Sequence, residues 1–248
     1  MGKDTLYIVM PAYNEEACIE QVVRGWHAVV LSHGDEDSRL MVVDDGSRDS
    51  TFSILEGLSS ELGRLVPVTK PNAGHGPAVL HGYAKAIEAG AGWVFQTDSD
   101  GQTDPAEFDG FWSERDENDF VFGVRRNRGD GFKRELVEKV LCLILFLFFG
   151  ERIPDANAPF RLMRADRLAE HISHLPADYA IPNAMVTVYA KHAGDRCLFK
   201  EISFGARESG KNSIGLRRIA RIGIESIKGF AALRRELHGK SSRSGERS

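Results

Sequence analysis

The sequence has few cysteines, and its first residues lack the pattern of a secretory leader. Three cysteines in 248 residues lie far apart, at Cys18, Cys142 and Cys197, without the spacing of metal ligands. An odd, scattered set argues against a disulfide framework and favours a reducing compartment. The first four residues lead into an apolar stretch of only a few positions, so we expect no secretory signal.

Long apolar segments are also lacking. The longest uninterrupted apolar run covers residues 140–149. Because a helix that crosses a bilayer needs about 20 apolar residues, this run predicts no membrane span. A helix that is apolar on every side must be buried somewhere. Two interpretations stay open: a helix of the protein core, or a helix in the membrane interface that contacts a lipid.

An excess of one charge is absent from the whole chain but present at its C-terminal end. The formal net charge of −4 argues against a nucleic-acid-binding protein. Residues 207–248 carry 11 Lys and Arg against 4 Asp and Glu. Residues 216–238 predict a basic amphipathic helix and residues 239–248 a disordered tail. Such a helix either contacts anionic lipid head groups or packs, solvated, against the domain or a partner.

The first half of the chain alternates strand and helix patterns. Its composition, 42% hydrophobic and 27% charged, is that of a globular protein. Short apolar runs predict strands at residues 6–10, 40–43, 66–68, 93–97 and 120–123. Helical periodicity predicts helices at residues 15–31, around 52–58, where Asp49 or Ser50 can act as the cap, and at 76–89. The alternation predicts an α/β fold, with a mostly parallel sheet covered by helices.

Acidic residues follow two of these strands directly. Asp98 and Asp100 come after the strand at 93–97, and Asp44 and Asp45 come directly after the strand at 40–43. Right-handed crossovers place the C-termini of parallel strands along one edge, where α/β sheets bind ligands. Carboxylate oxygens suit Mg²⁺ or Mn²⁺, especially when phosphates complete the shell. A lone Asp-x-Asp is more often a solvated turn, so the convergence of several acids is what favours a cation site.

A glycine-containing loop at residues 70–77 precedes the third predicted helix. Backbone amides near Gly74 and the helix N-terminus can approach a phosphate. The loop is not a Walker motif, because no Gly-Lys-Ser/Thr follows. A histidine such as His75 is more often a surface loop residue than a catalyst.

Four motifs occur in the order and spacing of a known family. They are Pro-Ala-Tyr-Asn-Glu at 11–15, Val-Asp-Asp-Gly-Ser at 43–47, Asn-Ala-Gly-His-Gly at 72–76 and Asp-Ser-Asp-Gly-Gln at 98–102. With them the chain resembles family 2 glycosyltransferases, which have a GT-A (Rossmann-like) nucleotide-sugar domain. The resemblance is nearest to the dolichyl- and polyprenyl-phosphate mannose synthase-like branch. Downstream motifs at 123–125, 155–161 and 207–213 support this branch.

The resemblance implies a domain at residues 1–215, with a nucleotide-sugar half to about residue 125 and an acceptor half at 126–215. It implies an inverting, metal-dependent enzyme that uses Mg²⁺ or Mn²⁺. Asp100 would be the main metal ligand, helped by Gln102 and Asp98, and Asp98 would also touch the nucleoside. A bound cation stabilises the charge that develops on a departing diphosphate.

The resemblance also assigns the remaining donor contacts. Asp45 would accept hydrogen bonds from the base or ribose, and Gly74 would lie near the nucleoside. The catalytic set would be Asp100, Asp98 and Arg125. The base and ribose would be lined by Pro11, Ala12, Tyr13 and Glu15, although plain core packing also accounts for Tyr13. Phosphate would be bound by Arg125, Arg207 and Lys211, because cationic side chains grip phosphate oxygens.

The acceptor half lacks an acidic pair that many family members use as a general base. The corresponding residues, 181–186, include no acid, and Asp178 is the nearest one. A sugar hydroxyl needs its proton removed, whereas a phosphate monoester is already anionic. We therefore expect a polyprenyl phosphate acceptor. Transfer to a saccharide hydroxyl in cell-surface glycan synthesis, or an inactive nucleotide-binding module, are the alternatives.

These features predict where the protein works and what it meets. We expect a cytoplasmic enzyme at the cytoplasmic face of the membrane, with peripheral contact through residues 136–149 and 216–237. The expected partners are a nucleoside-diphosphate sugar and a lipid phosphate, and no nucleic acid. The sequence does not decide between GDP-mannose and a UDP-sugar, and the oligomeric state stays open.

Overall fold

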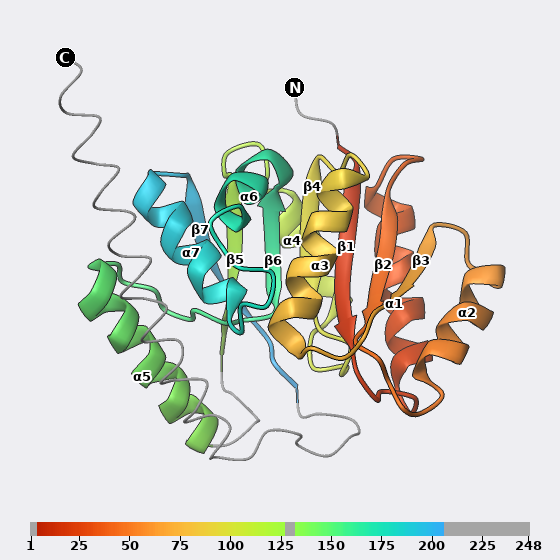
Figure 1. The fold of residues 1–248 in the computed structure, drawn as a ribbon. Helices are drawn as coiled ribbons and strands as arrows, with labels where there is room; N and C mark the ends of the chain where they lie inside the picture. Colours follow the sequence, from red (N-terminus) through yellow and green to blue (C-terminus); the bar gives the residue numbers. More distant parts are fainter. Residues whose placement is uncertain (1–3, 127–131, 206–248) are drawn as a thin grey trace.

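The computed structural model describes residues 4–126 and 132–205. Within them, seven strands form one sheet in the order β3-β2-β1-β4-β6-β5-β7 (Figure 1). The strands are β1 (Leu6–Ala12), β2 (Arg39–Asp44), β3 (Leu65–Thr69), β4 (Trp93–Thr97), β5 (Phe120–Arg125), β6 (Phe160–Arg164) and β7 (Cys197–Ile202). Arg207, Lys211, the predicted amphipathic helix and the predicted tail lie outside the described residues.

The sheet is parallel except for one strand. β3, β2, β1 and β4 pair in parallel, and β5 pairs in parallel with β7. β6 runs antiparallel to both of its neighbours, β4 and β5. The predicted α/β fold with a mostly parallel sheet is confirmed. The C-termini of β1, β2 and β4 lie side by side at one edge, as expected for parallel strands joined by right-handed crossovers.

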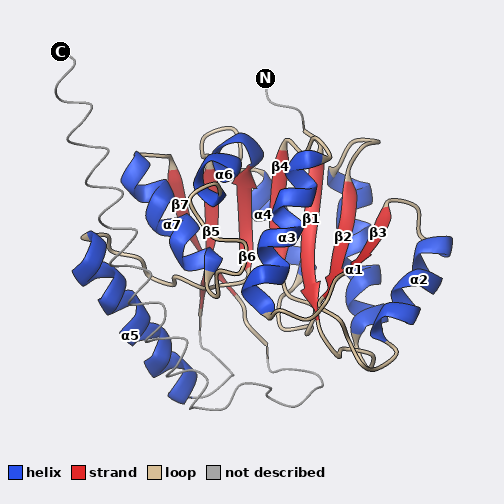
Figure 2. Cartoon of the chain, in the orientation of Figure 1, coloured by secondary structure: helices blue, strands red, loops and turns tan. Residues whose placement is uncertain are grey.

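Helices cover both faces of the sheet (Figure 2). On one face lie α1 (Ile19–His33), α2 (Thr51–Glu61), the 3-10 turn η1 (Pro105–Glu107) and α4 (Phe108–Trp112). On the other lie α3 (His75–Glu88), α6 (Ala165–Ile172) and α7 (Pro182–Ala193). Trp26 of α1 packs its ring against Phe95, Phe108 and Phe160, at centroid distances of 5.2, 6.4 and 5.8 Å. Aromatic burial of this kind contributes much of the stability of a core.

The apolar run at 140–149 belongs to α5 (Phe132–Phe149), which lies outside α7 (Figure 1). One side of α5 is core: Leu145 is fully buried and packs in a cluster with Met185 and Val188 of α7. The opposite side carries an exposed apolar stripe, formed by Val140, Leu143, Phe146 and Leu147. The core interpretation therefore holds for one side of this helix, and contact of the other side with a membrane stays a prediction. Among the described residues, no helix has both the length and the apolar character that crossing a membrane requires.

The sequence pattern placed the strands of the first half correctly but misjudged one helix start. The helix expected from residue 15 begins at Ile19, because Glu15 is held in a turn. The backbone carbonyl of Glu15 accepts hydrogen bonds from the backbone N–H groups of Cys18 and Ile19, and its own N–H donates to Thr51 Oγ1 at 2.8 Å. The pattern also missed β6 and β7, both in the second half of the chain.

Candidate active site

The loops that follow β1, β2 and β4 are joined by direct contacts at the C-terminal edge of the sheet. The backbone N–H of Asp45, after β2, donates to the carbonyl of Ala12, the last residue of β1, at 2.9 Å. After β1, Cys18 Sγ lies 3.5 Å from the Ser99 carbonyl in the loop that follows β4. The motifs around residues 11–15, 43–47 and 98–102 are therefore brought together, as predicted from their positions at the ends of parallel strands.

Asp45 organises the loop ahead of α3. Its carboxylate accepts from Lys70 Nζ at 2.5 Å and from the backbone N–H groups of Ala73 at 3.0 Å and Gly74 at 2.7 Å. Its side chain is buried, with 4% exposed. Gly74 has a φ of 103°, a conformation that favours glycine. The predicted contact of Asp45 with a base or ribose stays a prediction; what the structure shows is that Asp45 and Lys70 shape this loop.

Asp44 holds the turn that follows β2. Its carboxylate accepts from the Thr69 hydroxyl at 2.9 Å and from the backbone N–H of Ser47 at 3.2 Å. Gly46, inside the turn, has a φ of 68°, and a Cβ there would lie 2.9 Å from the backbone nitrogen of Asn72. The turn and the 70–74 loop are thus packed backbone to backbone, which only glycine at position 46 allows.

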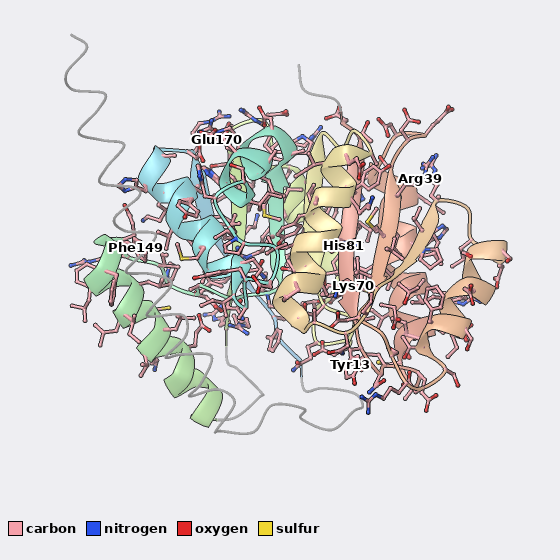
Figure 3. The ribbon with its side chains drawn as sticks, viewed as in Figure 1. Tyr13, Arg39, Lys70, His81, Phe149 and Glu170 are labelled. Carbon is pink, nitrogen blue, oxygen red and sulfur yellow. The ribbon has the colours of Figure 1, made fainter. Side chains whose placement is uncertain are left out.

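The residues predicted to line the donor pocket lie at or just beyond the end of β1. Pro11 and Ala12 are buried strand residues that pair with Val43 and Asp44 of β2. Glu15 is buried, and Tyr13 is half-buried. Figure 3 shows Tyr13 at the lower edge of the molecule, where β1 ends. Their contact with a nucleoside stays a prediction, in a location that suits it.

The Asp98–Gln102 loop carries the predicted metal ligands. The Asp98 side chain is 26% exposed, and its Oδ1 accepts from Gln96 Nε2 at 3.0 Å and lies 3.9 Å from His75 Nε2. Asp100 Oδ1 accepts from the backbone N–H of Gln102 at 3.2 Å. Gln102 is buried, and its Nε2 donates to the carbonyl of Gly205 at 2.8 Å. No sequence pattern predicted that His75 would lie beside Asp98.

This donor set fits a cation that is shared with a substrate. The described parts of the chain hold no group of three or more His, Cys, Asp or Glu side chains that could ligate a metal on their own. Asp98 and Asp100 provide two carboxylates within one short loop. Mg²⁺ and Mn²⁺ commonly bind through one or two carboxylates, while water and substrate phosphates fill the other positions. The residues therefore fit an ion that binds together with a diphosphate.

Arg125 is held in a buried ion-pair network. Its guanidinium donates to both carboxylate oxygens of Asp155, at 2.7 Å each, and to Glu138 Oε2 at 3.4 Å, and its side chain is only 7% exposed. The network ties the end of β5 to α5 and to the loop before β6. The predicted contact of Arg125 with phosphate stays a prediction. In this structure the guanidinium faces carboxylates.

Arg161 is a buried residue whose role the sequence did not reveal. It is fully buried in β6 and donates to the carbonyls of Asn183 at 2.7 Å and Ala158 at 3.1 Å, and to Thr187 Oγ1 at 2.6 Å. Burial lowers its pKa to about 10, which still leaves it charged at neutral pH. A buried charge is tolerated when hydrogen-bonded in this way. Arg161 thereby fixes the first turn of α7 against the sheet.

Known proteins resemble this chain in sequence and in fold. The model of the family described as Glycosyl transferase family 2 matches residues 7–172. The UDP-N-acetylglucosamine–dolichyl-phosphate N-acetylglucosaminyltransferase of Methanococcus voltae is 30% identical over 181 residues, which cover 65% of this chain and 70% of that protein. The undecaprenyl-phosphate 4-deoxy-4-formamido-L-arabinose transferase of Enterobacter sp. (strain 638) is 26% identical over 160 residues. That match covers 63% of this chain and 48% of the relative, so the chain spans about half of its length.

Solved structures share the fold. The glucosyl-3-phosphoglycerate synthase of Mycobacterium tuberculosis, in complex with Mn²⁺ and UDP-glucose, superposes with a TM-score of 0.66 at 20% identity, covering 90% of this chain and 77% of that one. The mannosyl-3-phosphoglycerate synthase of Rubrobacter xylanophilus gives a TM-score of 0.66 at 19% identity, covering 94% and 74%. At such identities the likeness establishes the fold and leaves the substrates to other arguments.

Proposed function

Because the chain belongs to glycosyl transferase family 2 and is a glycosyltransferase of GT-A fold, we propose that it moves a sugar from a nucleoside-diphosphate sugar to a polyprenyl phosphate. One observation carries the proposal: the loop that Asp45 holds leads into His75, and His75 Nε2 lies 3.9 Å from Asp98 Oδ1, in the short loop that also carries Asp100. Two carboxylates beside a glycine loop suit a cation and a diphosphate. The sequence relatives, which act on dolichyl and undecaprenyl phosphates, support the acceptor.

The leaving group sets the chemistry that the site must perform. A bound Mg²⁺ or Mn²⁺ would supply Lewis-acid stabilisation of the departing diphosphate. Asp100 and Asp98 would hold that ion, and Gln102, tied to Gly205, keeps their loop in place. Lys70 and Asp45 fix the loop that leads to the N-terminus of α3, whose amides favour negative charge. Hydrogen bonds within the protein hold these groups, and preorganisation of this kind is usually the largest catalytic contribution.

For the donor, we favour a UDP-sugar over GDP-mannose. The support is the donor in the name of the Methanococcus voltae relative and the UDP-glucose in the Mycobacterium tuberculosis complex. A thermal-shift panel of UDP- and GDP-sugars with Mn²⁺ tests the choice. A ligand at about 100 times its Kd adds about 2.7 kcal/mol to folding stability. Stabilisation by GDP-mannose and by no UDP-sugar would contradict it.

The same panel tests the cation site. Asp100→Ala should abolish Mn²⁺-dependent stabilisation by the donor. The matched control is Asp109→Ala on α4. The Asp109 side chain is 84% exposed and pairs with His33, the last residue of α1, at the end of that helix away from the candidate site. That variant should respond to donor and Mn²⁺ as the wild type does. If Asp100→Ala responds as fully as the control, the assigned metal ligand is wrong.

The acceptor assignment rests on what stands at the start of α7. Within residues 181–186, which include no acid, Asn183 is buried, with 2% exposed, and its amide donates to Gln96. The nearest acid in sequence, Asp178, is exposed. Because a phosphate monoester needs no base, this arrangement favours a lipid phosphate over a saccharide hydroxyl. The inactive-module alternative predicts no sugar transfer or donor hydrolysis at all, which an activity assay decides.

The exposed stripe of α5 is our proposed membrane contact. Fully withdrawing a leucine from water contributes about 1.5–3 kcal/mol. Replacing Leu143 and Leu147 with Glu should therefore weaken binding to anionic liposomes by more than about tenfold. Leu31→Glu, at a position 54% exposed on α1, is the control, because it changes a similar leucine on a different surface. Equal flotation of all three proteins would refute the contact.

A further inference from the structure

A chain of buried hydrogen bonds leads from α3 and α7 to the carboxylate of Asp98. The Tyr83 hydroxyl donates to Asn183 Oδ1 at 2.9 Å, and Asn183 Nδ2 donates to Gln96 Oε1 at 2.9 Å. Gln96 Nε2 then donates to Asp98 Oδ1 at 3.0 Å. Tyr83 and Gln96 are fully buried, and Asn183 is 2% exposed. We call Tyr83, Asn183 and Gln96 the amide relay.

The direction of the amide relay follows from its last acceptor. An ionised carboxylate only accepts hydrogen bonds, so Gln96 must turn its NH₂ group to Asp98 and its Oε1 to Asn183. That oxygen also only accepts, so Asn183 must turn its NH₂ to Gln96 and its Oδ1 to Tyr83. Burial raises the pKa of Tyr83, which keeps the hydroxyl protonated and able to donate. Neither amide can flip without setting two donors or two acceptors against each other.

Three elements of the fold hold the amide relay in place. Gln96 lies on β4, Tyr83 on α3 and Asn183 at the start of α7. Arg161 from β6 fixes the backbone of Asn183 through the 2.7 Å bond to its carbonyl. Buried polar networks that are fully satisfied are rigid, because moving one member leaves its neighbours unpaired. The orientation of Asp98 Oδ1 is therefore coupled to the packing of both helices on this face of the sheet.

We propose that Tyr83, Asn183 and Gln96 are positioning residues that hold the Asp98 carboxylate in the orientation required by the cation and the donor diphosphate. The inference rests on the proposed function, and it adds residues that contact neither substrate nor ion. Ligands that are fixed before binding lose less conformational freedom when the ion arrives. Outer partners of metal ligands typically change metal affinity by about 10–100-fold when they are removed.

The test measures Mn²⁺ affinity by calorimetry in the presence of UDP, for Gln96→Leu, Asn183→Leu and Tyr83→Phe. Each variant removes a buried hydrogen bond, so each should lower Tm. Mn²⁺ affinity should fall in a graded way: about 10–100-fold for Gln96→Leu, less for Asn183→Leu, and least, about threefold, for Tyr83→Phe. A purely structural role gives no such gradient with distance from Asp98. Tyr83→Phe, the most conservative change, carries the test if a leucine variant does not fold.

The matched control is Ser38→Ala. Ser38 is fully buried, accepts from the backbone N–H of Leu6 at 2.8 Å and lies at the opposite edge of the sheet, where β1 begins. This variant should melt lower than the wild type and bind Mn²⁺ normally. Relay variants that melt lower but keep wild-type Mn²⁺ affinity would overturn the inference.

The proposed function fails in a different way. If the wild type shows no Mn²⁺-dependent UDP binding, or if Asp100→Ala binds Mn²⁺ as the wild type does, the cation site itself is wrong. If instead the wild type binds, Asp100→Ala does not, and the relay variants match the wild type, only the positioning role is wrong.

Discussion

Asp45→Asn is the variant that most sharply tests how Asp45 holds the loop at residues 70–74. The Asp45 carboxylate binds Lys70 Nζ at 2.5 Å and two consecutive backbone amides, those of Ala73 and Gly74. Asparagine keeps the shape of the side chain but removes the charge and one acceptor oxygen. Lys70 Nζ and the Ala73 N–H share Oδ1, whereas the Gly74 N–H donates to Oδ2, so in the variant either Gly74 alone or Lys70 and Ala73 together lose their acceptor.

The magnitude follows from the burial of the groups involved. A hydrogen bond to a charged group contributes about 1.5–3 kcal/mol, and breaking a buried ion pair costs about 3–5 kcal/mol. Lys70 keeps some contact with water, because its side chain is 15% exposed, so the upper values do not apply. We expect a loss of about 2–4 kcal/mol in the free energy of unfolding. For a domain of this size, that corresponds to a fall in Tm of about 10 °C.

Calorimetric melting in parallel with Glu88→Gln is the assay. Glu88 pairs with Lys85 on the surface of α3 and is 71% exposed, so losing that pair should change stability by less than about 1 kcal/mol. Asp45→Asn should also bind UDP more weakly, since the 70–74 loop loses its anchor. A Tm within about 2 °C of the wild type would refute the reasoning.

Three further predictions concern other parts of the molecule. Gly46→Ala should cost about 1–3 kcal/mol in unfolding free energy, because its new Cβ meets the Asn72 backbone at a positive φ, and an unchanged denaturant midpoint would contradict that packing. Hydrogen bonds from Arg196 lower the pKa of Asp119. The stability that Asp119 contributes is therefore present above its unfolded pKa, about 3.9, and lost as the pH falls through its lower folded value, so Asp119→Asn should flatten the acid limb of a stability–pH curve. Asp178→Asn should keep wild-type turnover, and loss of turnover with donor affinity retained would indicate a required base.

The sequence predicted the first half of the fold well because its strands are unbroken apolar runs. The Trp93–Thr97 strand and the acids after it are local features, and a parallel sheet brings such strand ends together by topology alone. β6 escaped prediction because Arg161 and Arg164 interrupt its apolar pattern. Only the fold reveals that the Arg161 charge is buried and satisfied by backbone carbonyls.

The sequence predicted where the candidate site lies, but it did not predict which residues support the site through hydrogen bonds. Asp98 and Asp100 stand out in the sequence by their spacing. Their supports do not, because Asn183 lies 87 positions from Gln96 and 100 from Tyr83 along the chain. The pairing of Arg125 with Asp155 likewise joins residues 30 positions apart. Contacts of this range depend on how helices pack on the sheet, which no local pattern records.

Transfer of labelled sugar from a UDP-sugar to polyprenyl phosphate, measured as label extracted into organic solvent, tests the central claim most directly. With Mn²⁺ the wild type should produce labelled lipid, and Asp100→Ala should reduce the rate by about 100-fold or more. Chelation of the metal should have the same effect on the wild type. Undiminished transfer by Asp100→Ala, or no labelled lipid from any nucleoside-diphosphate sugar, would contradict the account.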